Sequence, residues 1–276
     1  MNYTLQKDKI IIFDKEEFKP KHIIECGQIF CYKKIDDVTY IVYSADKMAK
    51  VKECENYVEI ETDNIDYFVN YFDLNTNYTT LKNKFINDYP YLTKAINYGT
   101  GIRILKQSPF ETIIGFIISA NNNIKRIQKI MFAIRQTFGK NMGEYYSFPT
   151  AQDLSKATEQ DFKNMGAGYR AKYLVEATKQ LLNADYESLR KLSTEELNKY
   201  LLTIMGVGQK VADCIMLFAF SKGDVFPVDT WIEKVYCSYF EEEHNRVTIR
   251  KNLLNTFGEN SGYIQQYLFY SQRENS

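Results

Sequence analysis

The feature that most constrains the fold of this chain is a pair of apolar helical segments separated by a very short glycine turn. Residues 194–204 and 209–220 both show helical periodicity, and Met-Gly-Val-Gly lies between them. Glycines permit the positive φ angles and the close backbone approach that such a reversal requires, so the pattern predicts a helix-hairpin-helix. The backbone N–H groups of Gly206, Val207 and Gly208 are then expected to bind phosphate without reading sequence. The alternative is a purely structural turn.

Lys210 lies in the first turn of the second helix, with Cys214 one turn further on and Asp229 nineteen residues later. A lysine attacks carbon only after losing its proton, and burial and a helix N-terminus both lower its pKa from about 10.4. Asp229 is expected to cap the next helix, which keeps the carboxylate ionised and able to stabilise positive charge opposite it. We therefore predict that Lys210 is a buried nucleophile and Asp229 its catalytic partner. The alternatives are an exposed lysine and a simple helix cap.

The order of the predicted elements indicates an α+β fold. Residues 8–14, 38–45 and 57–63 are short, rich in β-branched and aromatic residues, and predict strands of an antiparallel sheet. Helical patterns follow at 65–74 and 80–89. We expect an N-terminal sheet domain at residues 1–105 and a helical domain at residues 106–276, with the hairpin at about 194–220.

Capping signals mark several helix boundaries in the second domain. Ser108 with Glu111, and Ser193 with Glu196, fit the capping-box pattern at two helix starts. A further helix is predicted at residues 124–138, ending at Gly139, after an asparagine triplet.

Composition excludes several classes of protein. The chain of 276 residues is 45% apolar and has a net charge of zero, so it can build a core but gives no electrostatic indication of its partner. Its five cysteines contain no Cys-x-x-Cys pair, which argues against a disulfide framework and against a thiolate metal site. Neither a signal peptide nor a membrane-spanning run is evident, so we expect an intracellular protein without membrane contact.

The hairpin, the lysine after it and the aspartate beyond it together resemble the HhH-GPD superfamily of base-excision DNA glycosylases. The lysine is typical of the bifunctional branch, and further motifs resemble 8-oxoguanine DNA glycosylase/AP lyases over nearly the whole chain. These motifs are Cys-Gly-Gln-Ile-Phe at 26–30, Asn-Asn-Asn-Ile-Lys-Arg at 121–126, Gly-Ala-Gly-Tyr-Arg at 166–170 and Gly-Tyr-Ile-Gln-Gln-Tyr-Leu-Phe at 262–269.

The resemblance implies a TBP-like antiparallel sheet domain followed by an all-helical domain, and double-stranded DNA containing 8-oxoguanine, preferably opposite cytosine, as the partner of a monomer. Lys210 and Asp229 would be catalytic, and Lys210 would form a Schiff base before β-elimination nicks the strand. The strand at 26–30 would present the Gly27 carbonyl to the N7 hydrogen of the lesion. The base pocket would contain Gly27, Cys214, Gln265 and Phe269, and the residues at the orphaned cytosine would be Asn121, Arg126, Tyr169 and Arg170.

The same resemblance implies that no cofactor and no iron–sulfur cluster are required. It further implies a monovalent cation, Na⁺ or K⁺, held by the backbone carbonyls of Leu202, Ile204 and Val207. One position departs from the family pattern, because Trp231 stands where a histidine often contacts phosphate.

Three rival functions share parts of this pattern. A superfamily lyase for oxidised pyrimidines usually carries four clustered cysteines, whereas only Cys237 follows the hairpin helix here. A glycosylase for alkylated bases lacks the lysine. A non-enzymatic hairpin protein that docks on DNA would tolerate replacement of Lys210.

Overall fold

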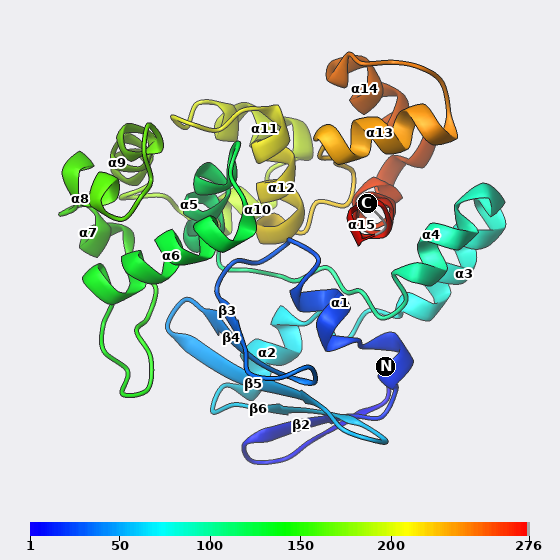
Figure 1. Cartoon of the computed structure of the whole chain (residues 1–276), viewed down its shortest axis with the longest axis horizontal. Helices are drawn as coiled ribbons and strands as arrows, with labels where there is room; N and C mark the ends of the chain where they lie inside the picture. The colour runs from blue at the N-terminus through cyan, green and yellow to red at the C-terminus, as the bar shows by residue number, and fades with distance from the viewer. Residues whose placement is uncertain (275–276) are drawn as a thin grey trace.

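A six-stranded antiparallel sheet forms the first layer of the molecule (Figure 1). The structure is a computed structural model that describes residues 1–274. The sheet has the strand order β1-β2-β6-β5-β4-β3, and every neighbouring pair is antiparallel. Its strands are β1 Tyr3–Leu5, β2 Lys9–Ile12, β3 Tyr32–Lys34, β4 Thr39–Ser44, β5 Lys47–Glu53 and β6 Val58–Glu61.

The three strands predicted from the sequence are confirmed as β2, β4 and β6. Strands β1, β3 and β5 were missed, and lysines explain the last two. In β5, Ala49 and Val51 face the core while Lys50 and Lys52 face solvent, so the strand has little apolar character as a whole. The strand expected at residues 26–30 is wrong, because this segment is an irregular loop between α1 and β3.

Four helices accompany the sheet in the first part of the chain, and eleven follow residue 105 in the described part. The first group is α1 Pro20–Ile24, α2 Ile65–Tyr71, α3 Tyr78–Asp88 and α4 Thr93–Tyr98. The second is α5 Pro109–Ser119, α6 Ile124–Phe138, α7 Ala151–Leu154, α8 Glu159–Asn164, α9 Arg170–Gln180, α10 Tyr186–Lys191, α11 Thr194–Leu202, α12 Gln209–Phe220, α13 Thr230–Tyr239, α14 Arg246–Phe257 and α15 Ser261–Glu274. Short 3₁₀ turns are η1 Lys15–Glu17, η2 Pro90–Leu92 and η3 Gly258–Asn260.

The apolar side chains form three clusters, and the third joins helices before residue 105 to the last three described helices. One cluster lies under the sheet and a second among α5 to α12. The third combines α3 and α4 with α13, α14 and α15, and Figure 1 shows these helices side by side at one end of the molecule. The boundary near residue 105 stays a prediction, and helices on both sides of it share this core.

One of the two predicted capping boxes is present. Ser193 and Glu196 form the reciprocal pair at the start of α11. Ser108 makes no side-chain cap on α5, so the capping box predicted there is wrong. Glu111 instead pairs with the buried Arg135 at 2.5 Å and accepts from the backbone N–H of Ala45 at 2.7 Å. A buried cation needs that carboxylate more than the partly exposed start of α5 does.

Candidate active site

An open cleft of about 680 Å³ brings together five of the predicted site residues from distant parts of the sequence. They come from the loop after α1, the turn between α5 and α6, the starts of α12 and α13, and α15. These residues are Gly27, Asn121, Lys210, Asp229 and Phe269. Clefts that collect a few polar groups on an apolar wall are the usual form of a ligand site.

Lys210 lies half-buried in the first turn of α12, with its Nζ 5.5 Å from the centroid of the Phe116 ring. Burial lowers its pKa, but the neighbouring Cys214 and Asp229 side chains favour the charged amine more strongly, so the pKa is raised. The lowered pKa expected from the sequence is therefore wrong for the free protein. Lys210 rests as an ammonium and must lose a proton before it can attack.

Asp229 is the N-cap of α13, as predicted. Its Oδ1 accepts from the backbone N–H groups of Trp231 at 2.9 Å and Ile232 at 3.0 Å. Since both cap bonds end on one oxygen, Oδ2 is not used by the cap. The Asp229 side chain acts on Lys210 through its charge and favours the ammonium form of the amine.

Cys214 and Gln265 are buried and do not line the cleft. Burial raises the pKa of the Cys214 thiol to about 11, so this group is neutral beside the Lys210 amine. Gln265 has a buried Oε1 atom without a hydrogen-bond partner in residues 1–274. An unsatisfied buried oxygen costs about 1–3 kcal/mol, and functional sites are where such costs persist.

The asparagine turn at one edge of the cleft is held together by Arg170. Asn121 adopts φ +50°, and Asn123 caps α6 by accepting from the backbone N–H of Arg126 at 3.0 Å. Arg170 is buried and donates to the carbonyl of Ala120 at 2.9 Å and to that of Asn121 at 2.7 Å. In the free protein, therefore, the Arg170 guanidinium contacts backbone carbonyls and the turn is already shaped.

Tyr169 and Arg126 flank this turn on the molecular surface. Tyr169 is 58% exposed, and its ring lies 4.4 Å from the Arg170 guanidinium carbon. Arg126 is exposed and donates to the carbonyl of Gly166 at 2.8 Å. Both side chains are accessible to a partner, whereas Arg170 would have to exchange its present bonds.

The hairpin has the predicted form, and its two glycines have different surroundings. Gly206 adopts φ +89°, and a Cβ there would lie 2.9 Å from the Cβ of Tyr173. Gly208 begins α12 at φ −96°, and no described atom lies within 4 Å of the position of an added Cβ. The turn requires glycine at position 206. The glycine at position 208 leaves the backbone there uncovered by a side chain.

The carbonyls predicted to hold a monovalent cation partly fit that function. Ile204 accepts from the backbone N–H of Val207 at 3.0 Å. The carbonyls of Leu202 and Val207 accept no hydrogen bond from another described residue. These two oxygens would coordinate the cation, with the second lone pair of Ile204 as a third donor.

Two contributors near the cleft were missed in the sequence. Asp213 is buried and accepts from Arg250 of α14 at 2.6 and 2.8 Å. Arg273 of α15 lines the cleft beside Gly27. An aspartate inside an apolar helix signals a buried partner, but a pairing across 37 residues leaves no local pattern that would identify Arg250.

In the part of the chain that the structure describes, no helix has the length and apolarity needed to cross a membrane.

Comparison with known families agrees with the fold. Residues 114–256 match the family model of HhH-GPD superfamily base excision DNA repair proteins. The chain therefore belongs to the HhH-GPD superfamily. Residues 10–113 match a second model, described as the N-terminal domain of 8-oxoguanine DNA glycosylase.

Individual proteins are also similar to this chain. The crystal structure of the 8-oxoguanine glycosylase/lyase of Clostridium acetobutylicum, bound to double-stranded DNA with cytosine opposite 8-oxoG, is similar, with a TM-score of 0.93 and 38% identity. That match covers 100% of this chain and 98% of the clostridial one. The N-glycosylase/DNA lyase of Saccharomyces cerevisiae is 34% identical over 67% of this chain and 53% of its own length. The Arabidopsis thaliana counterpart is 34% identical over 62% and 52%. The chain thus spans about half the length of these two curated relatives.

Proposed function

We propose that this protein is a base-excision repair DNA glycosylase and AP lyase that removes 8-oxoguanine from duplex DNA. The observation that carries the proposal is the placement of Lys210 and Asp229 in one cleft together with Gly27 and Phe269. A lysine beside a carboxylate, facing a glycine backbone and an aromatic ring, suits nucleophilic attack on a nucleotide that has been rotated out of the duplex. The similarity to the clostridial glycosylase/lyase supports the same substrate.

The chemistry follows from the residues present. Lys210 loses its proton, and its Nζ forms a bond to C1′ of the flipped nucleotide while the bond from C1′ to the base breaks. Asp229 stabilises the positive charge that develops on the sugar. The base leaves with the bonding electron pair and takes a proton. The sugar ring then opens to a Schiff base with Lys210, and β-elimination breaks the strand on the 3′ side.

Base recognition would use other residues in and near the cleft. The Gly27 carbonyl would accept the N7 hydrogen that 8-oxoguanine carries and guanine lacks. Phe269 would stack on the base, and the unpartnered Oε1 of Gln265 would accept a hydrogen bond from its Watson–Crick edge.

The orphaned base and the DNA backbone use the surface around the asparagine turn. Asn121 would fill the vacated space, Tyr169 would insert beside the orphaned base, and Arg126 would hydrogen-bond a cytosine there. Arg170 would join it by exchanging its carbonyl bonds. The hairpin N–H groups at 206–208 would bind phosphate, with the cation at Leu202, Ile204 and Val207 supporting the turn.

The assignment includes a monomer that acts on chromosomal DNA inside the cell, with a cytoplasmic location, and domains at about 1–105 and 106–276. One lesion exposes one nucleotide to one cleft, so a single copy contains every residue that the reaction uses.

Borohydride trapping tests the proposal. The wild-type protein and Lys210→Gln are incubated with duplexes that contain 8-oxoguanine opposite each of the four bases, then reduced. We expect a covalent adduct from the wild type only, strongest opposite cytosine. No adduct from the wild type, or an equal one from the variant, contradicts the proposal. An equal adduct opposite all four bases would contradict the roles of Arg126 and Tyr169 alone.

A further inference from the structure

The loop that carries Gly27 is fastened to helix α15 by two side chains that the proposed reaction does not use. Arg273 donates from Nη2 to the carbonyl of Glu25 at 2.5 Å, and Gln266 donates from Nε2 to the carbonyl of Cys26 at 3.2 Å. Gln266 is 2% exposed, whereas Arg273 reaches the cleft. One helix therefore holds two consecutive carbonyls immediately before Gly27.

The residue after Gly27 is held equally firmly from the other side. Gln28 is fully buried, donates to the carbonyl of Arg103 at 2.8 Å and accepts from the backbone N–H of Leu105 at 2.9 Å. Its own carbonyl accepts from Gln107 at 2.8 Å. The Gly27 carbonyl thus lies between two anchored peptide units, so its direction is determined by its neighbours.

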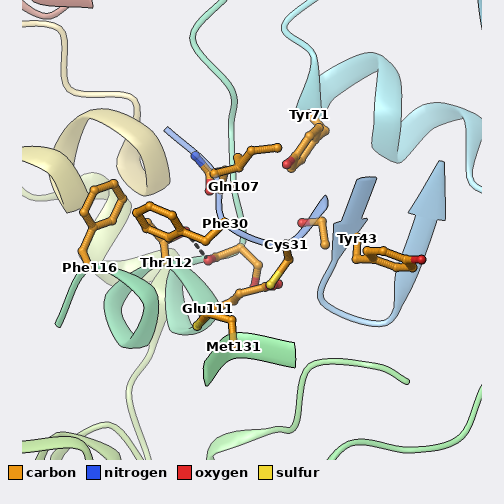
Figure 2. A pocket seen from close by; sticks show the side chains of 12 residues that line it. Phe30, Cys31, Tyr43, Tyr71, Gln107, Glu111, Thr112, Phe116 and Met131 are labelled. Carbon is orange, nitrogen blue, oxygen red and sulfur yellow. Dashed lines mark hydrogen bonds between the residues drawn. The ribbon is translucent and has the colours of Figure 1, made fainter. Parts of the chain in front are cut away.

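The same loop continues into Phe30, which connects it to the catalytic side of the cleft. Figure 2 shows the Phe30 and Phe116 rings together at the small cavity next to the cleft, and their centroids are 5.3 Å apart in an edge-to-face arrangement. Phe116 is the ring under the Lys210 amine. The Gly27 loop therefore also contacts the aromatic pair beside the nucleophile, so a test of this loop needs a separate measurement of Lys210 reactivity.

Arg273 also lies beside both Gly27 and Phe269. A Cβ on Gly27 would lie 3.0 Å from Nη1 of Arg273 and 3.4 Å from Cε1 of Phe269. The guanidinium carbon lies 5.6 Å from the centroid of the Phe269 ring. Helix α15 thus presents the stacking ring and the loop anchor to the same glycine.

We propose that Gln266 and Arg273 are positioning residues that aim the Gly27 carbonyl and so set the preference for 8-oxoguanine over guanine. The inference rests on the proposed function, in which that carbonyl distinguishes an N7 hydrogen from a bare N7. A hydrogen bond weakens steeply as its angle departs from linear, so a loosened carbonyl loses the attraction to the lesion and also the repulsion of guanine.

Binding discrimination in an inactive background tests this inference. Gln266→Leu and Arg273→Met are each made in Lys210→Gln, and the Kd is measured for duplexes with 8-oxoguanine or guanine opposite cytosine. We expect the ratio of the two Kd values to fall by about tenfold in each variant, which is about 1.4 kcal/mol and the size of one hydrogen bond. Gln266→Leu changes no charge, so its effect separates aiming from electrostatic attraction. Arg273→Lys should recover part of the ratio.

A second measurement distinguishes a change in the direction of the Gly27 carbonyl from a general loss of activity. Borohydride adducts on an abasic duplex need Lys210 but no base, so their rate should change by less than about twofold in Gln266→Leu with Lys210 intact. Arg190→Met is the matched control for Arg273→Met, because the Arg190 guanidinium also binds a carbonyl, that of Ala219 at 2.8 Å, away from the cleft. It should leave the Kd ratio unchanged.

The outcomes are distinguishable. An unchanged Kd ratio in both variants overturns the inference, as does a parallel fall in lesion discrimination and abasic adducts. If the wild-type protein shows neither a preference for 8-oxoguanine nor an adduct, the result contradicts the proposed function instead.

Discussion

The carboxylate of Asp213 accepts two hydrogen bonds from the guanidinium of Arg250, at 2.6 and 2.8 Å, and is fully buried. Asp213 follows Lys210 by one turn on α12, and Gln209 adds a third bond to it at 2.9 Å. Arg250 lies on α14. The pair therefore ties the helix of the proposed nucleophile to the helices that follow Asp229.

Removing Arg250 should destabilise the protein in a pH-dependent way. Arg250→Met leaves a buried carboxylate unpaired, which costs about 3–5 kcal/mol. Burial already raises the pKa of Asp213, opposed by Arg250, and the substitution raises it further. A raised pKa in the folded state means that folding favours the protonated carboxyl group. The free energy of unfolding is therefore highest below the ordinary carboxylate pKa, and it falls as the pH rises through the pKa of the folded state. Urea unfolding of variant and wild type at acid and neutral pH measures this. An equal difference at both pH values contradicts it.

The rate of base removal should rise with pH through the neutral range. Lys210 has a raised pKa and must become neutral before it attacks. Asp229→Asn removes a charge that favours the ammonium, so the rising limb should move to lower pH while the maximal rate falls by about 10²-fold or more. Single-turnover rates on 8-oxoguanine duplexes across pH measure both effects. A limb that stays in place in Asp229→Asn would show that Asp229 does not act on the lysine.

The two hairpin glycines should separate folding from DNA binding. Gly206→Ala places a Cβ against Tyr173 at positive φ and should lower the free energy of unfolding by about 1–3 kcal/mol. Gly208→Ala meets no described atom and should leave stability within about 0.5 kcal/mol. If a phosphate group approaches the backbone at position 208, the methyl group of the alanine should nevertheless weaken binding to undamaged duplex DNA. Thermal unfolding and fluorescence anisotropy give the two numbers, and unchanged affinity in Gly208→Ala would remove the hairpin from the DNA interface.

Substitutions of Tyr169 and Arg170 should likewise separate an effect on DNA binding from an effect on stability. Tyr169→Ala removes an exposed ring and should lower affinity for lesion DNA with a change in stability below about 0.5 kcal/mol. Arg170→Met removes the donors that hold the carbonyls of Ala120 and Asn121, so it should lower stability and affinity together. Denaturant melts and Kd measurements on both variants check this contrast. Full affinity in Tyr169→Ala would refute its role as a wedge.

Local signals in the sequence predicted much of the helical part. The bounds of α12, the cap at Asp229 and the end of α6 at Gly139 follow from glycine, capping residues and apolar periodicity, which act over a few residues. The capping box predicted at Ser108 failed because of a contact distant in sequence. Glu111 carries a good capping pattern, yet its partner Arg135 lies on another helix, and no local rule measures that competition.

The candidate site was likewise predictable only in part. Residue type and position were sufficient to select Lys210, but its raised pKa depends on side chains that come together only in the folded protein. Likewise, Gln266 and Arg273 look like ordinary polar positions of α15. Their contacts with residues 25 and 26 join segments more than 200 residues apart, beyond the reach of periodicity.

The position of α15 constrains how this protein can be made. It packs on α4 and α13, supplies Phe269, and holds the Gly27 loop, yet within residues 1–274 it is synthesised last. Contacts between segments so distant in sequence form slowly and late. A nascent chain with its sheet and hairpin already folded on the ribosome would therefore lack the wall of the cleft that contains Phe269, and the proposed site should be complete only once α15 has left the exit tunnel and docked.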